Sequence, residues 1–153
     1  MSDETRTTLP LSRALLGTWS LVARIDVTDA GERRADPALG EDPVALLVYD
    51  RTGHFAAQFM KRDRSSSSAD APTDAPNNSR AVGGYDAYFG TYLVDDARGT
   101  VTQRLVGSLS AENVGMELTR AMTVVGDVLT IRLRTTSANG EPITRTLTWT
   151  RIG

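Results

Sequence analysis

The chain has 153 residues, a formal net charge of -2, and 40% hydrophobic and 24% charged residues, the balance expected of one soluble domain. It contains no cysteine and a single histidine, which excludes disulfides, thiolate metal ligands and a cysteine nucleophile and argues against a metal site. Acidic and basic residues are interspersed, and no apolar run reaches about 18 residues, so we expect neither nucleic acid nor a membrane as a partner.

The N-terminal segment carries few structural signals. We expect residues 1–9 to be frayed and residues 9–16 to form one short helical turn, for which Ser12 is a candidate cap. The first six residues lack the basic-then-apolar order of a signal peptide, so we expect a cytoplasmic protein.

Eight segments downstream have the composition and alternation of short β-strands, and tight turns join most of them. They cover residues 17–26, 44–49, 54–60, 83–95, 100–108, 116–125, 128–135 and 142–151. The pair Gly126-Asp127 is typical of a two-residue hairpin with glycine first. This pattern predicts an all-β fold, either a sandwich or an antiparallel up-and-down β-barrel. A closed barrel of eight strands is just wide enough for one small ligand.

Two long polar segments separate these strands. Residues 27–43 are rich in glycine, proline and charge, and residues 61–83 include four consecutive serines. Such segments bury no core, and structureless loops of this length are either functional or disordered. We therefore expect each to be a candidate lid over one barrel end, with 61–83 mobile and plain disorder as its alternative.

Residues 83–95 hold three of the four tyrosines. The tyrosine spacings of three and four could fit one helical face, but the glycines at 83, 84 and 90 favour a turn that leads into a strand. On a strand, Tyr88 and Tyr92 point to one side, which predicts a cavity with polar aromatic contacts. Tyr85, in the turn, could cap the mouth of that cavity. These glycines do not form a phosphate loop, and we expect no cofactor.

Several motifs, in order along nearly the whole chain, resemble those of the small bacterial and fungal lipocalin-like domain family. They are residues 16–22, 53–64, 84–92 and 99–102, Arg120, and residues 126–130. The resemblance implies one domain over residues 1–153, folded as a calycin-type barrel with an internal pocket. It implies little about chemistry, because such barrels host both binders and enzymes. The family often has histidine where this chain has Gln103; if that histidine is a base in the family, this chain lacks it.

The opening Gly17-Thr18-Trp19 also resembles the Gly-x-Trp start of the lipocalins. In that family the tryptophan closes one barrel end and packs near a basic residue of the last strand. The resemblance gives Trp19 and Arg151 this structural role here.

Strand faces that mix apolar and polar residues supply the candidate pocket groups. Arg120 is flanked on its own face by Leu118 and Met122. An arginine there would suit a carboxylate, an enolate or another anionic oxygen. Tyrosine and glutamine would orient a carbonyl or hydroxyl, and histidine could move a proton. The ligand-binding candidates are His54, Gln58, Tyr85, Tyr88, Tyr92, Gln103, Arg120 and Arg145.

Structural alternatives stand beside these assignments. The opposite face of the third strand, Phe55, Ala57 and Phe59, could be the inner one, which would turn His54 and Gln58 outward. Arg120 could form a structural salt bridge, and the tyrosines could be core aromatics with satisfied hydroxyls.

These observations predict a module that binds a small, mostly apolar molecule bearing a carbonyl or acid group. The alternative is an isomerase or cyclase that acts on a polyketide-like or terpenoid-like intermediate, with His54, Tyr92 and Arg120 as catalytic candidates. A third hypothesis is a protein-interaction module whose barrel interior is fully packed. We expect a monomer or a homodimer.

Overall fold

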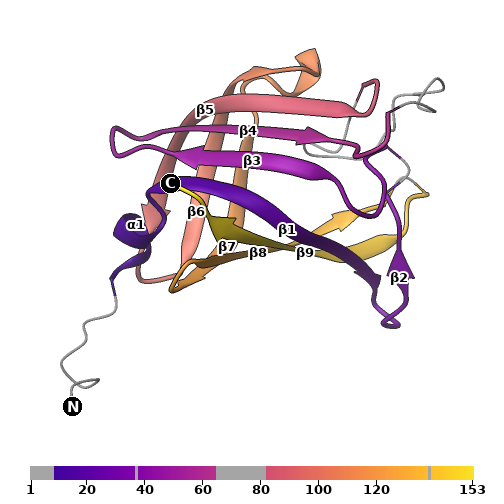
Figure 1. Cartoon of the computed structure of the whole chain (residues 1–153), viewed down its shortest axis with the longest axis horizontal. Helices are drawn as coiled ribbons and strands as arrows, with labels where there is room; N and C mark the ends of the chain where they lie inside the picture. Colours follow the sequence, from indigo (N-terminus) through magenta and orange to yellow (C-terminus); the bar gives the residue numbers. More distant parts are fainter. Residues whose placement is uncertain (1–8, 37, 65–81, 138) are drawn as a thin grey trace.

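The computed structural model describes residues 9–36, 38–64, 82–137 and 139–153, and these residues form a closed antiparallel β-barrel (Figure 1). Barrel strands adjacent in sequence pair with each other, and β9 returns to pair with β1. The predicted eight-stranded, all-β barrel with a short N-terminal helical turn is confirmed. Its strands are β1 Gly17–Thr28, β3 Val44–Tyr49, β4 His54–Met60, β5 Tyr85–Asp95, β6 Thr100–Ser108, β7 Glu117–Val125, β8 Val128–Thr136 and β9 Pro142–Arg151.

Within the described part of the chain, three short elements complete the fold. The two-residue strand β2 (Arg33–Arg34) pairs only with β1, so the segment 27–43 contains a strand in addition to its loops. A single 3₁₀ turn, η2, covers Ala111–Asn113. The helix α1 covers Leu11–Ala14. No helix in the described ranges is long and apolar enough to cross a membrane.

Ser12 does not cap α1, which corrects the sequence prediction. The N-cap residue is Pro10, and no side chain caps the helix. The backbone N–H and the hydroxyl of Ser12 instead donate to the two carboxylate oxygens of Asp96, at 2.8 and 2.7 Å. Ser12 therefore ties α1 to the turn after β5. The predictions for residues 1–8 and 65–81 lie outside the described residues.

The barrel end next to α1, which we call the closed end, is filled by Trp19 and Arg151. The Trp19 indole is fully buried and donates a hydrogen bond to the Leu15 carbonyl oxygen at 2.9 Å. The Arg151 guanidinium lies 4.4 Å from the centre of the indole ring and donates to the carbonyl oxygens of Ala14 and Leu16. This cation–π contact and these bonds confirm the predicted structural role of Trp19 and Arg151. Figure 1 shows α1 at this end and β2 at the opposite, open end.

A β-bulge changes which side of β1 faces the barrel interior. Leu21 pairs with Trp149, but Ala23 pairs with Thr148, so Val22 is the extra residue. The alternation of side chains therefore shifts by one position after Val22. Trp19 faces inward before the bulge. After it the buried residues are Arg24, Asp26 and Thr28, whereas an uninterrupted alternation from Trp19 would have turned Ala23 and Ile25 inward. Three polar side chains thus enter the open half of the barrel.

A second irregularity explains the glycine inside the tyrosine-rich strand. The register of β5 with β6 shifts between Phe89 and Gly90. A Cβ atom built on Gly90 would lie 1.8 Å from the carbonyl oxygen of Arg104. No side chain fits there, so the close approach of the two strands requires glycine.

Candidate ligand pocket

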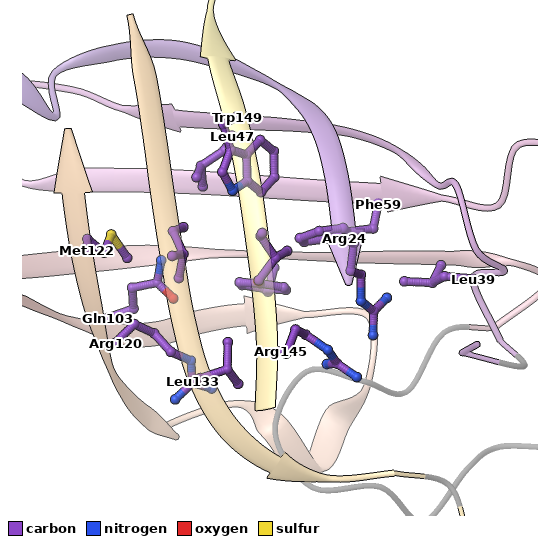
Figure 2. Close-up of a pocket in the computed structure, with 13 residues that line it drawn as sticks. Arg24, Leu39, Leu47, Phe59, Gln103, Arg120, Met122, Leu133, Arg145 and Trp149 are labelled. Atoms are coloured by element: carbon purple, nitrogen blue, oxygen red, sulfur yellow. The ribbon is translucent and has the colours of Figure 1, made fainter. Parts of the chain in front are cut away.

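A pocket opens from the centre of the barrel toward its open end, and its cavity volume is about 50 Å³. All eight barrel strands contribute side chains, and Leu39 covers part of it from the segment after β2. Figure 2 shows the arginines gathered on one side of this space and the aromatic residues on another. The lining residues are Arg24, Leu39, Leu47, Phe59, Tyr88, Gln103, Arg120, Met122, Ile131, Leu133, Arg145, Leu147 and Trp149.

The prediction that His54 and Gln58 face this interior is wrong. In β4 the buried residues are Phe55, Ala57 and Phe59, while His54 and Gln58 are exposed. The His54 ring instead lies 2.9 Å from the Thr52 hydroxyl in the β3–β4 turn. Phenylalanine on the inner face buries far more apolar area than histidine or glutamine would, which decides the orientation. His54 and Gln58 are therefore outside the pocket.

The tyrosines of β5 take three different places. Tyr88 and Tyr92 are both buried and face inward, as predicted. Tyr88 lines the pocket, whereas the Tyr92 hydroxyl donates to the Asp50 carbonyl oxygen at 2.6 Å. Tyr92 thus helps to close the barrel near the β3–β4 turn. Tyr85 is half-buried on the other face of β5, and the Arg64 guanidinium lies 6.0 Å from its ring centre.

Gln103 and Arg120 come from the neighbouring strands β6 and β7, and both line the pocket (Figure 2). The Gln103 amide nitrogen donates to the Tyr49 hydroxyl at 2.6 Å, and that hydroxyl lies 3.9 Å from the Met122 sulfur. Arg120 donates one bond, to its neighbour's carbonyl oxygen at 3.1 Å, and forms no ion pair with any described carboxylate. Burial lowers the pKa of the Arg120 guanidinium below its usual value.

The two other pocket arginines already hold carboxylates. Arg145 and Asp26 are opposite each other on β9 and β1, both buried, and form a two-pronged ion pair at 2.9 and 3.1 Å. Arg24 pairs with Asp36 at 2.5 Å, which ties the segment after β2 to the barrel wall. Burial and the nearby Arg145 charge lower the pKa of the Arg24 guanidinium. Arg120 is thus the pocket arginine without a described carboxylate partner.

Unsatisfied donors are concentrated in this pocket. Within the described ranges, three buried nitrogen atoms of lining residues have no hydrogen-bond partner: Arg24 Nε, Arg120 Nη2 and Trp149 Nε1. Buried polar atoms normally have partners, and an unmade bond costs about 1–3 kcal/mol. The pocket therefore favours a molecule, or ordered water, that brings acceptor oxygens.

Asp86 is a buried acid that the sequence analysis did not single out. Its side chain is 1% exposed, and neither carboxylate oxygen has a hydrogen bond of standard geometry to a described residue. Burial raises its pKa to about 7, against the lowering effects of the Ala87 backbone N–H and Arg24. It lies on β5 opposite Phe59, on the same inner face as Tyr88, but it is not among the residues that line the pocket.

The described residues offer no cluster of three or more histidine, cysteine or acidic side chains that could hold a metal ion. The pocket chemistry is that of an apolar and aromatic chamber with cationic and neutral donors at one side. Such a chamber can bind and orient a small molecule through its acceptor oxygens.

The family model of the lipocalin-like domain matches residues 16–152. The chain belongs to this family. No curated protein matches the chain significantly. The family resemblance suggested by the motifs at residues 16–22 and 84–92 is thus confirmed over almost the whole chain.

Three buried charged residues of this lipocalin-like domain, in or near the pocket, were not singled out from the sequence. Arg24 and Asp26 were missed because nothing in the sequence marks Val22 as a bulge. Asp86 did carry a signal. The alternation that places Tyr88 and Tyr92 inward also places Asp86 inward, two residues earlier.

Proposed function

We propose that this lipocalin-like domain binds a small, mostly apolar molecule through an acid or carbonyl group, with Arg120 as the principal contact. The observation that carries the proposal is the unpartnered Arg120 Nη2, which is buried in the pocket wall without a described carboxylate nearby. A buried cation of this kind gains most from an anionic oxygen, because a charge-assisted hydrogen bond satisfies both charge and donor.

The apolar part of the ligand would lie against the aromatic and aliphatic wall. Phe59 and Trp149 pack edge to face with ring centres 5.8 Å apart, and Phe59 also stacks on Tyr88. Leu147 and Ile131 continue this wall on β9 and β8. A hydrocarbon or ring placed here is removed from water, while its acid group faces the arginines.

Isothermal titration with octanoate and with its neutral counterpart octanol tests the proposal. We expect Arg120→Met to weaken octanoate binding by about tenfold to a hundredfold and to leave octanol binding within about twofold. The matched control is Arg132→Met, because Arg132 is exposed on the outer face of β8. Equal effects of Arg120→Met on both ligands, or none on either, would refute an acid contact at Arg120.

An isomerase or cyclase activity in the same pocket stays a prediction with less support. Of its three catalytic candidates, His54 is exposed on the outer face and the Tyr92 hydroxyl is bonded to Asp50. Of these three, Arg120 alone would remain to stabilise an enolate, and no histidine or acidic side chain accompanies it among the described lining residues. A cytoplasmic location and a monomeric or homodimeric state likewise stay predictions. Native mass spectrometry of the purified protein would measure the oligomeric state and any retained ligand together.

A further inference from the structure

Gln103 is a neutral polar residue placed deep in the pocket wall. It is 5% exposed and lies on β6 between Tyr92 of β5 and Leu118 of β7. A buried amide that lacks partners costs free energy, and it offers both a donor group and an acceptor oxygen. The hydrogen bonds that Gln103 makes within the protein therefore decide whether its N–H group or its carbonyl oxygen is available to a ligand.

The amide orientation follows from Tyr49. This tyrosine is 1% exposed, and burial raises its pKa, so its hydroxyl keeps its single proton. The hydroxyl points that proton at the Met122 sulfur and accepts from the Gln103 amide nitrogen at 2.6 Å. The Gln103 carbonyl oxygen is then left over: no described residue donates to it, and it is not among the fully buried atoms that lack a partner, so it stays accessible.

Arg120 is a neighbour of Gln103 on the adjacent strand. In the register of β6 with β7, Gln103 is opposite Leu118 and Val101 is opposite Arg120. Gln103 and Arg120 are thus diagonal neighbours on the inner face, a separation that long side chains bridge. Figure 2 shows the two side chains beside each other at the edge of the pocket. One ligand can therefore meet a cationic donor and a neutral acceptor at once.

We propose that the pocket selects acids that carry a hydroxyl or N–H group close to the carboxylate. The carboxylate would bind Arg120, and the neighbouring donor would bind the Gln103 carbonyl oxygen. A bound acid without that donor would cover this carbonyl oxygen without bonding to it, or leave it dependent on a water, which is the basis of discrimination. This inference rests on the proposed function and adds the ligand class and a specificity-determining residue to it.

The test compares three acids on the wild-type protein by isothermal titration: octanoate, 3-hydroxyoctanoate and 3-methoxyoctanoate. We expect 3-hydroxyoctanoate to bind about tenfold more tightly than either of the others, because it alone carries a donor beside the carboxylate. The measurement needs no variant, so it tests the preference for a hydroxy acid even if substitutions at Gln103 impair folding. Equal affinities, or a methoxy acid that binds as tightly as the hydroxy acid, would overturn the proposal.

A substitution then assigns the preference to its residue. In the variant Gln103→Met, the methionine is similar in size to glutamine but has no carbonyl oxygen. We expect the affinities of this variant for 3-hydroxyoctanoate and octanoate to become about equal. The matched control is Gln58→Met on the exposed face of β4, which should keep the wild-type ratio. A preference that survives in Gln103→Met would remove Gln103 from the recognition of the ligand.

The two proposals fail in different ways. If octanoate and 3-hydroxyoctanoate bind equally but Arg120→Met weakens both, the acid pocket stands and the selection by Gln103 falls. If neither acid binds to the wild-type protein, the proposed function falls and takes this inference with it.

Discussion

The two ends of this barrel use arginine in opposite ways. At the closed end, Arg151 stacks on Trp19 and donates to two backbone carbonyl oxygens, so the guanidinium is held by the fold itself. At the open end, Arg120 donates one bond to the main chain and keeps a buried nitrogen without a described partner. Satisfied polar groups stabilise a structure, whereas unsatisfied ones in a concave site indicate what the site binds. This contrast separates the structural end of the molecule from the candidate functional end.

The open end also contains buried charges that are not free to serve a ligand. Arg145 and Asp26 satisfy each other, and Arg24 holds Asp36. Their neighbour Asp86 has no such bond to a described residue. Buried charged residues at this end therefore differ in role: some form structural ion pairs and others lack such a partner. Substitutions can distinguish these roles.

The largest effect is expected at the closed end. Trp19→Ala removes the largest fully buried side chain and leaves Arg151 without its ring, so we expect a loss of about 3–5 kcal/mol in the free energy of unfolding. Urea denaturation followed by circular dichroism measures it. A loss below about 1 kcal/mol would show that this end does not stabilise the barrel.

A loss almost as large is expected for Arg145→Met at the open end. The substitution leaves the Asp26 carboxylate buried without its main partner, which costs about 3–4 kcal/mol. The double variant Arg145→Met with Asp26→Leu should recover most of this loss in the same denaturation experiment. Without recovery, the damage would come from packing rather than from a stranded charge.

Asp86 should make stability depend on pH. Its pKa is raised from 3.8 to about 7 in the folded state, so folding favours the protonated acid. The benefit is complete below about pH 4 and is lost as pH rises from 4 through 7. We therefore expect Asp86→Asn to be more stable than wild type at pH 8, by on the order of 2–3 kcal/mol, and nearly equal to it at pH 4.

Melting temperatures of both proteins across pH 4–8 measure this difference. The exposed Asp42, which pairs with Arg62 at the surface, provides the control variant Asp42→Asn. Parallel pH curves for wild type and Asp86→Asn would contradict a buried, titrating Asp86.

The smallest effect on stability is expected for Arg120→Met. Removing a buried cation that lacks a described carboxylate partner should change the free energy of unfolding by no more than about 1 kcal/mol, while octanoate binding weakens by about tenfold to a hundredfold. Chemical denaturation without ligand measures the first quantity. A loss of 3 kcal/mol or more would show that Arg120 stabilises the fold as Arg145 does, and would contradict its proposed role as a ligand contact.

The strand segments were predictable because each has a local cause. Period-two alternation and the turn residues between strands set the boundaries, and four of the eight strands match the predicted ranges in full. The face of β4 was misjudged although Phe55 and Phe59 carried the right signal. The family motif containing His54 and Gln58 was weighted above the greater apolar area of the phenylalanines.

The sequence by itself determined the strand pattern, the membership of a lipocalin-like family and the pairing of Trp19 with Arg151, because local propensity and recognisable motifs specify these. Only the tertiary structure decided which charges enter the pocket. A single extra residue at Val22 inverts the faces of β1, and strand pairing, rather than composition, places Arg24 and Asp26 inside. The isolation of Arg120 and Asp86 is equally a property of the closed barrel, since it depends on which neighbours seven other strands bring to each side chain.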